Sequence, residues 1–277
     1  MRALKTIATA AFAVTAAISS AFAADMAPRY TKAPPPVVLY NWTGFYIGGN
    51  AGYSWGRSNT DGYFYNNTTN VLLGTGNGAF DMDGWVAGGQ AGYNWQAGSW
   101  VLGVEGDAQA TGQKGSILFN CPGVICSTNT AIPIALAPVN ATLTNELEWF
   151  ATFRGRAGYT FTPTVLGYVT GGLAVGGVKG SGVITGFNAF GVPVASSFSG
   201  DDTQVGWTVG AGIEASLGGN WTGKIEYLYL DLGRFNTSAV LLTNAPPIRA
   251  DFSSHITDHI LRAGINYRFG GPVVARY

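Results

Sequence analysis

The chain has 277 residues, a length that suits one large β domain or two small ones. Glycine is very abundant at 41 residues, aromatic residues make up 13%, charged residues only 11%, and the formal net charge is zero. Glycine without a three-residue period excludes a collagen triple helix, and the apolar content argues against a disordered chain. The neutral balance provides no electrostatic footprint for nucleic acid, so no nucleic-acid partner is expected.

Residues 1–23 have the pattern of a secretory signal peptide. Arg2 and Lys5 precede an uncharged, alanine-rich run, and Ala21-Phe22-Ala23 offers small residues for cleavage. A transmembrane anchor is the alternative, but it fits less well because the run is rich in Ala, Thr and Ser. No other stretch reaches the roughly 18–20 apolar residues of a spanning helix. A membrane location would therefore require a closed barrel.

Residues 24–41 contain Pro28 and the run Pro34-Pro35-Pro36 with few apolar anchors. Such a segment favours an extended polyproline geometry without packed structure. We expect it to be a periplasmic lead-in to the first strand. A contact with peptidoglycan would need a motif that this segment does not show.

The segment 44–56 alternates with a period of two, which predicts a β-strand with one apolar face. The segment 84–96 repeats the pattern forty positions later. Aromatic residues at both ends of the apolar face, with small residues between them, are typical of a strand that crosses a bilayer between two interfacial bands. The apolar faces carry Phe45, Ile47, Gly49, Ala51, Tyr53 and Trp55 in the first segment, and Trp85, Ala87, Gly89, Ala91, Tyr93 and Trp95 in the second.

Six further strands are predicted by the same alternation, and they are joined by alternating long and short connections. The strand at 165–176 is apolar on both faces, which leaves its facing open. The other five strands are 100–110, 147–161, 204–217, 221–231 and 256–269. Tight turns are expected at 96–99, 162–164 and 218–220, and long loops at 57–82, 111–145, 177–202 and 233–253.

Eight strands with four long and three short connections predict an all-β, eight-stranded antiparallel up-and-down transmembrane barrel over residues 42–269. Both termini, including the tail 270–277, then lie on the periplasmic side. A soluble lipocalin-like barrel is the rival, but such barrels point their apolar faces inward. The residues expected to anchor the barrel in the membrane are Trp55, Trp85, Trp95, Trp149, Trp207, Tyr227, Tyr267 and Phe269.

The two ends of the barrel resemble a known family. Residues 42–49, Trp-Thr-Gly-Phe-Tyr-Ile-Gly-Gly, are similar to the first strand of the porin-like outer-membrane β-barrels of alphaproteobacterial surface antigens, and 264–274 to their last strand and tail. The resemblance covers nearly all of the mature chain. It implies an outer-membrane surface antigen with possible host or ligand contacts. The expected partners are outer-membrane lipid, lipopolysaccharide, and the export and barrel-assembly machinery.

Charged residues of both signs are predicted to face the interior of the barrel. An eight-stranded barrel has an interior only wide enough for side chains, and unpaired charges there would cost several kcal/mol each. We therefore expect a plug of mutually neutralising charges, while a charged constriction in a pore is the alternative. The set comprises Glu105, Asp107, Arg154, Arg156, Glu214, Lys224, Glu226, Arg262 and Arg268.

Cys121 and Cys126 are the only cysteines. In an oxidising envelope they are expected to form a local disulfide rather than to stay free thiols, and a metal site would need further ligands nearby. His255 and His259 share a strand face about 13 Å apart, too far for joint metal ligation. A role in haem contact is implied only by the resemblance, and polar residues of the membrane rim are the simpler interpretation.

Catalysis has little support in the sequence. Asp258 adjoins His259, but neighbours in a strand face opposite sides. The run Gly74-Thr75-Gly76-Asn77-Gly78 lacks the Lys-Ser/Thr and helix of a phosphate-binding loop. We therefore expect no enzyme, no cofactor and no metal, and a structural role in envelope integrity with displayed loops. The alternatives are a narrow pore for small solutes, and haem or adhesin-type binding through the loops.

Overall fold

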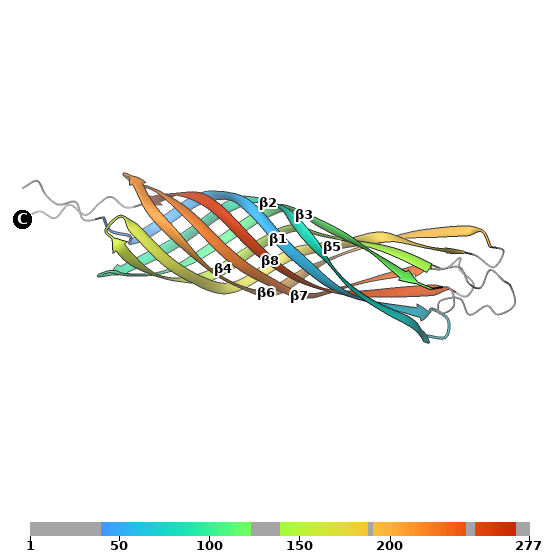
Figure 1. Ribbon diagram of the computed structural model, residues 1–277. Helices are drawn as coiled ribbons and strands as arrows, with labels where there is room; N and C mark the ends of the chain where they lie inside the picture. Colours follow the sequence, from blue (N-terminus) through green and yellow to red (C-terminus); the bar gives the residue numbers. More distant parts are fainter. Residues whose placement is uncertain (1–39, 123–138, 188–190, 242–246, 270–277) are drawn as a thin grey trace, which may run out of the picture. The chain divides into compact units, whose positions relative to one another are not determined.

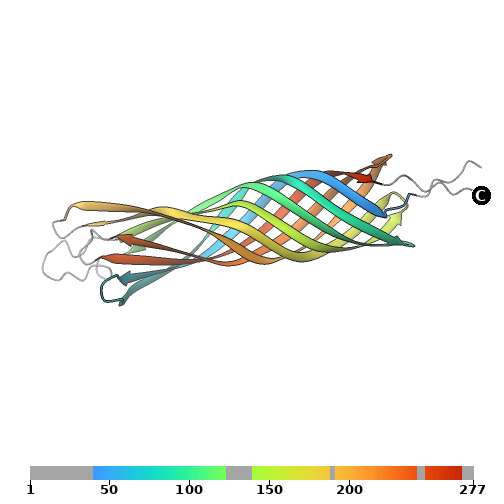
Figure 2. The ribbon, with the colours of Figure 1, turned by 180° about the vertical axis from the view of Figure 1, so that it is seen from behind.

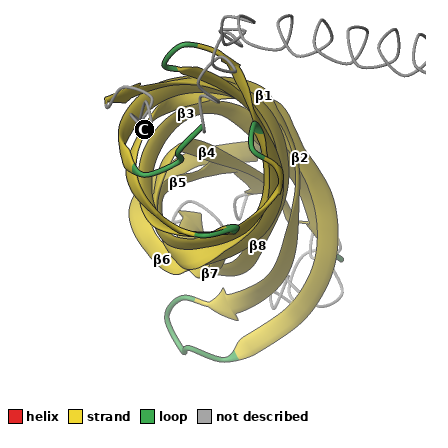
Figure 3. Cartoon of the chain, turned by 90° about the vertical axis from the view of Figure 1, so that its left-hand side faces the viewer, coloured by secondary structure: helices red, strands yellow, loops and turns green. Residues whose placement is uncertain are grey.

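A computed structural model of the protein describes residues 40–122, 139–187, 191–241 and 247–269. They form eight antiparallel strands in sequential order, and the last pairs with the first to close a barrel (Figures 1 and 2). This confirms the predicted fold, and Figure 3 looks along the ring of strands. The strands are β1 (Gly44–Asn66), β2 (Leu72–Ala97), β3 (Trp100–Cys121), β4 (Val139–Thr162), β5 (Val165–Phe187), β6 (Pro193–Gly218), β7 (Trp221–Leu241) and β8 (Ile248–Phe269).

The predicted signal peptide, nearly all of the lead-in at 24–41 and the tail 270–277 lie outside the described residues. Among those that are described, no helix is long and apolar enough to cross a bilayer.

Three two-residue turns close hairpins at one end of the barrel, which we call the short-turn end. They are Gly98–Ser99, Pro163–Thr164 and Gly219–Asn220, all within the predicted turns. Gly98 and Gly219 have φ values of 61° and 57°, a left-handed conformation that glycine adopts without a Cβ penalty. The local sequence therefore sets the pairing register at this end.

The predicted bounds of the four long loops are wrong, because the strands continue through most of them. β1 extends to Asn66 and β2 begins at Leu72, so little of the predicted loop 57–82 remains. The predicted loops 111–145, 177–202 and 233–253 are likewise mostly strand. Side chains still alternate there, but the apolar ones now face inward and the polar ones outward. Phe64 faces inward with 2% of its surface exposed, whereas Asn59 faces outward. We call this the far end of the barrel.

Nearer the short-turn end, side chains alternate as predicted, with apolar residues outside. On β1, Ile47 is 45% exposed and the adjacent Tyr46 only 1%. The structure also settles the facing of β5, whose sequence left it open. Leu166 is buried in the interior, whereas Val169 and Leu173 face outward.

Outward aromatic side chains form two bands around the barrel. On β1 the bands are marked by Phe45 and Trp55. About ten residues of tilted strand between them cover about 25 Å, the height of the apolar band of an outer-membrane barrel. All eight predicted anchors lie in these bands. One band holds Phe45, Trp95, Trp100, Tyr159, Phe161, Trp221, Tyr267 and Phe269, and the other holds Tyr53, Trp55, Trp85, Trp149, Trp207, Tyr227 and Tyr229.

Acidic and basic side chains of the described strands face outward only beyond the second aromatic band. From β1 to β6 their signs alternate from strand to strand: Lys114 of β3 lies opposite Asp83 of β2 and Glu146 of β4, and its Nζ is 2.6 Å from the Glu146 carboxylate. This is the arrangement expected where the wall of the barrel leaves hydrocarbon. We call the outward charges nearest the second band the charged belt: Arg57, Asp81, Asp83, Lys114, Glu146, Glu148, Lys179, Asp201, Asp231 and Arg234.

Beyond the charged belt, the hydrogen-bonded ring opens along two seams. β2 pairs with β3 only as far as Asp83–Lys114, and β6 with β7 only as far as Trp207–Asp231. The other neighbouring pairs continue toward the far end. The far end therefore consists of two four-stranded sheets, β7-β8-β1-β2 and β3-β4-β5-β6, which enclose a common apolar core.

The interior is layered along the barrel. Trp42 and Leu166 belong to an apolar cluster at the short-turn end, and the predicted interior charges come next. A second apolar cluster includes Met82, Phe150 and Leu230, followed toward the far end by a third. The third cluster comprises Phe64, Phe119, Cys121, Val139, Ala141, Leu143, Ile184, Ala239, Leu241, Ile248, Ala250 and Phe252.

Replacement of Ile213 by Arg tests the outward apolar face. Ile213 lies on β6 between the aromatic bands and is 59% exposed. A cation at the bilayer midplane costs about 2–4 kcal/mol in such barrels. We expect that loss in a urea refolding titration with lipid vesicles. Thr203→Arg, on the same strand beyond the second band, is the control and should be nearly neutral; equal effects of the two changes would contradict the assignment.

Candidate functional site

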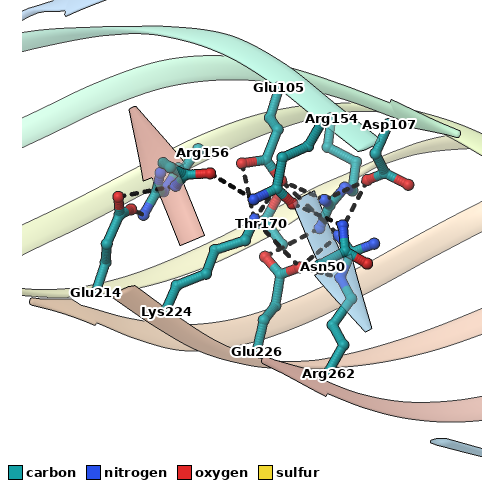
Figure 4. A network of polar contacts seen from close by, with 12 residues as sticks. Asn50, Glu105, Asp107, Arg154, Arg156, Thr170, Glu214, Lys224, Glu226 and Arg262 are labelled. Atoms are coloured by element: carbon teal, nitrogen blue, oxygen red, sulfur yellow. Dashed lines mark hydrogen bonds and ion pairs between the residues drawn. The ribbon is translucent and has the colours of Figure 1, made fainter. Parts of the chain in front are cut away.

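The candidate site is the network of charges in the interior, between the two apolar clusters nearest the short-turn end (Figure 4). Arg154 of β4 lies at its centre and is fully buried. Its guanidinium is 2.5 Å from the Glu105 carboxylate, 2.6 Å from Asp107 and 3.2 Å from Glu226. One cation therefore joins carboxylates from β3 and β7, which lie on opposite walls of the barrel.

Arg262 and Lys224 complete the connection across the interior. The Arg262 guanidinium is 2.6 Å from Glu226 and 3.0 Å from Asp107, and the Lys224 ammonium is 3.0 Å from Glu105. All of these side chains are at most 2% exposed. Each carboxylate thus has at least one buried cationic partner, as charges removed from water require.

A second ion pair lies beside this group. Arg156 bonds to Glu214, which also accepts hydrogen bonds from Thr222 Oγ1 at 2.5 Å and Asn266 Nδ2 at 3.0 Å. The Arg156 guanidinium carbon lies 3.6 Å from the centre of the Tyr168 ring. Together the two groups contain four acidic and four basic residues, so the network is electrically balanced.

Two tyrosines connect the groups. Tyr46 donates to Glu105 at 2.7 Å, and Arg156 Nη1 donates to the Tyr46 hydroxyl at 3.4 Å. Tyr168 donates to Glu226 at 3.0 Å. The alternation of β1 placed Tyr46 inward, but β5 gave no clear facing, so the role of Tyr168 could not be predicted.

Arg268 does not join the carboxylate network, contrary to the prediction. It lies nearer the short-turn end, where it donates to the backbone oxygen of Asn41 and its guanidinium carbon is 4.2 Å from the centre of the Tyr40 ring. Trp42, which was not predicted as an interior residue, has no exposed surface there. Its backbone N–H donates to Gln96 Oε1 at 2.7 Å and its indole N–H to Pro163 O at 3.2 Å. Residues 40–42 thus cover this mouth of the barrel.

Asp258 is a buried carboxylate on the other side of the network. It accepts hydrogen bonds from Ser54 Oγ and from Gln113 Nε2, the latter at 2.7 Å. None of the ion pairs among the described residues includes it. The adjacent His259 faces outward, so the two residues do not form the paired base and orienter of a hydrolase site.

Residues 9–269 match the outer membrane protein beta-barrel domain family. The chain belongs to this family. It is 36% identical over 256 residues, 91% of this chain and 94% of the relative, to the 31 kDa outer-membrane immunogenic protein of Brucella melitensis. It is also 29% identical over 272 residues, 97% of this chain and 100% of the relative, to the 25 kDa outer-membrane immunogenic protein of Brucella abortus.

Among solved structures, this outer-membrane barrel is similar to Neisserial surface protein A, with a TM-score of 0.37 and 13% identity over 82% of this chain and 98% of that one. A similarity at this level adds nothing to what the family match gives. The family match and the two Brucella relatives confirm the resemblance to outer-membrane surface antigens inferred from the two end strands, and the outer-membrane location.

Other predicted sites on this outer-membrane barrel are placed as follows. Cys126 lies outside the described residues, so its disulfide with Cys121 stays a prediction. His255 Nε2 lies 3.0 Å from Asp231, and His259 Nδ1 lies 2.6 Å from the Tyr227 hydroxyl at the second aromatic band. Within the described residues, no group of three or more His, Cys, Asp or Glu side chains is arranged to hold a metal ion.

Removal of one network cation should destabilise the barrel strongly. Arg262→Met leaves Asp107 and Glu226 buried with one cation fewer, and breaking such a group costs about 3–5 kcal/mol. The control is Lys114→Met, which removes the exposed pair with Glu146 and should cost at most about 1 kcal/mol. Refolding titrations of the two variants would contradict the network if their stabilities were equal.

Asp258→Asn should have the opposite effect. The amide keeps the shape: its oxygen accepts from Ser54, and its NH2 donates to Gln113 Oε1 once the Gln113 amide turns over. The change removes an ionised carboxylate that no cation compensates. We expect a gain of about 1–3 kcal/mol at pH 8. Asp107→Asn is the matched control and should destabilise, because Asp107 has two cationic partners. A loss of stability in Asp258→Asn at pH 8 would show that its charge is needed.

Proposed function

We propose that this outer-membrane protein is a closed structural barrel that supports envelope integrity and does not conduct. The observation that carries the proposal is the ion-paired network, in which Arg154 and Arg262 join carboxylates of opposite walls. A narrow barrel with side chains bonded across its interior leaves little room for a hydrated ion. The apolar clusters on either side of the network add barriers to ions.

In this proposal the short-turn end faces the periplasm and the far end lies outside the cell. Short turns on the periplasmic side and longer connections outside are the usual arrangement in such barrels. Both termini are then periplasmic. The far end, with its four longer connections, becomes the displayed surface, which fits the immunogenic character named for the Brucella relatives.

The charged belt then lies at the level of the outer lipid headgroups. Lys114 and Lys179 can contact phosphates of lipopolysaccharide, and acidic neighbours such as Asp83 can share bridging divalent cations with them. Lipid, lipopolysaccharide and the machinery that exports and inserts barrels are the partners we propose. The names of the relatives also support a protein without enzymatic activity.

Recording from planar bilayers tests the closed interior. We expect the refolded protein to insert without stepwise conductance under conditions in which a general porin, inserted as a positive control, gives clear steps. Stable, ion-selective steps from the wild-type protein would instead support the alternative, a narrow pore for small solutes. Insertion is checked independently by heat-modifiable gel mobility.

A further inference from the structure

At the far end, β6 is an open sheet edge. From Pro193 to Gly206 it pairs with β5 on one side, but among the described residues no strand pairs with its other side. β7 leaves it at Asp231, and the Phe235 and Thr237 side chains of β7 lie against Gly180 of β5 instead. Figures 1 and 2 show the yellow and gold ends of β5 and β6 set apart from the orange strands.

The backbone groups on this edge can be assigned by position. The Ser216 N–H donates to the Thr164 carbonyl at 2.9 Å, and the pairing of β5 with β6 continues from there without a bulge. In an antiparallel ladder, hydrogen-bonded residues alternate with residues whose N–H and C=O point away from that partner. Even-numbered residues of β6 therefore bond to β5. The odd-numbered residues direct their backbone groups to the open side: Ala195, Ser197, Ser199, Asp201 and Thr203.

The side chains on this edge indicate what could cover it. Val194 and Phe198 point inward and pack against the apolar core of the far end, yet both stay only partly buried. Residues 193–200 carry no charge, although natural edge strands are usually protected by charged residues. Asp201 and Asp202 follow, both exposed. The edge thus offers unpaired backbone groups, a partly covered apolar row and two negative charges at one end.

We propose that the β6 edge binds an extended polypeptide segment of a partner protein by strand addition. The segment would alternate apolar and polar residues, so that its apolar row covers Val194 and Phe198, and it would carry a basic residue near Asp201 and Asp202. Main-chain hydrogen bonds supply affinity in this mode and the alternate side chains supply selectivity. The proposal rests on the proposed orientation, because the partner must reach the far end from outside the cell.

A second copy of the chain fits the edge less well. Copies in one membrane stand in the same orientation, so two β6 edges related by a rotation about the membrane normal would run parallel. Parallel pairing is slightly less stable per residue than antiparallel pairing. A free segment can choose the antiparallel direction.

The test uses the full-length protein refolded in detergent and a fluorescein-labelled peptide with alternating valine and threonine and two lysines at one end. Ser197→Pro removes one edge N–H while leaving the bonds to β5 intact, and proline is tolerated at such edge positions. Ser197→Ala is the matched control, because it removes the hydroxyl and keeps the N–H. Fluorescence anisotropy should show binding by the wild type and Ser197→Ala within twofold of each other, and at least tenfold weaker binding by Ser197→Pro.

Heat-modifiable mobility must be the same for all three proteins, which separates loss of the edge from loss of the fold. Equal affinity of the proline and alanine variants, or no binding by the wild type, would overturn the proposal. Dimerisation of the wild type in sedimentation experiments that Ser197→Pro abolishes would assign the edge to a second copy and also overturn it. Binding in detergent does not depend on conductance, so the proposed closed interior can fail independently of this result.

Discussion

A hydrocarbon layer offers no hydrogen-bond partner, so each backbone N–H and C=O of a spanning strand must find its partner in a neighbouring strand. In this protein the pairing of β1 with β8 meets that requirement by closing the ring. Closure has a second consequence, because it gives every strand an inner and an outer face. Residues that alternate along a strand therefore lie on opposite faces of the wall: Ile47 faces lipid and Tyr46 faces the interior.

Closure also confines the interior charges. Carboxylates across the interior are reached by Arg154, Arg262 and Lys224, and apolar clusters on both sides shield these cations from water. The same ring need not stay closed outside the membrane, where water can bond to backbone groups. The seams at β2–β3 and β6–β7 begin at the charged belt, as this argument requires. The distribution of side chains changes there. Between the aromatic bands, apolar side chains face outward and charged side chains face inward. Beyond the bands, polar side chains face outward and apolar side chains face inward.

This inversion explains how far the sequence could predict the structure. All eight strands, the three turns and the facing of seven strands follow from a period of two and from turn residues such as Gly219. The strands beyond the belt were predicted as loops, because their outward residues, such as Asn59, are polar and their apolar row faces inward. The interior charges could be predicted as a set but not in their pairing. Arg268 faces inward on β8, as Arg262 does. The alternation could not show that Arg268 lies at the mouth of the barrel, away from the carboxylates. Trp42 was not predicted as an interior residue because it precedes β1, although its side chain lies on the same inward face as that strand's.

All of these features require that the wall between the two aromatic bands faces lipid. The direct measurement places a nitroxide spin label at Ala211 on β6, in a background with both cysteines replaced by serine, and compares its collisions with oxygen and with a water-soluble nickel complex in lipid vesicles. A second label at Ser199, beyond the belt on the same strand, is the reference for water. We expect the label at Ala211 to be relaxed mainly by oxygen and the label at Ser199 mainly by nickel. Relaxation of the Ala211 label mainly by nickel would contradict it.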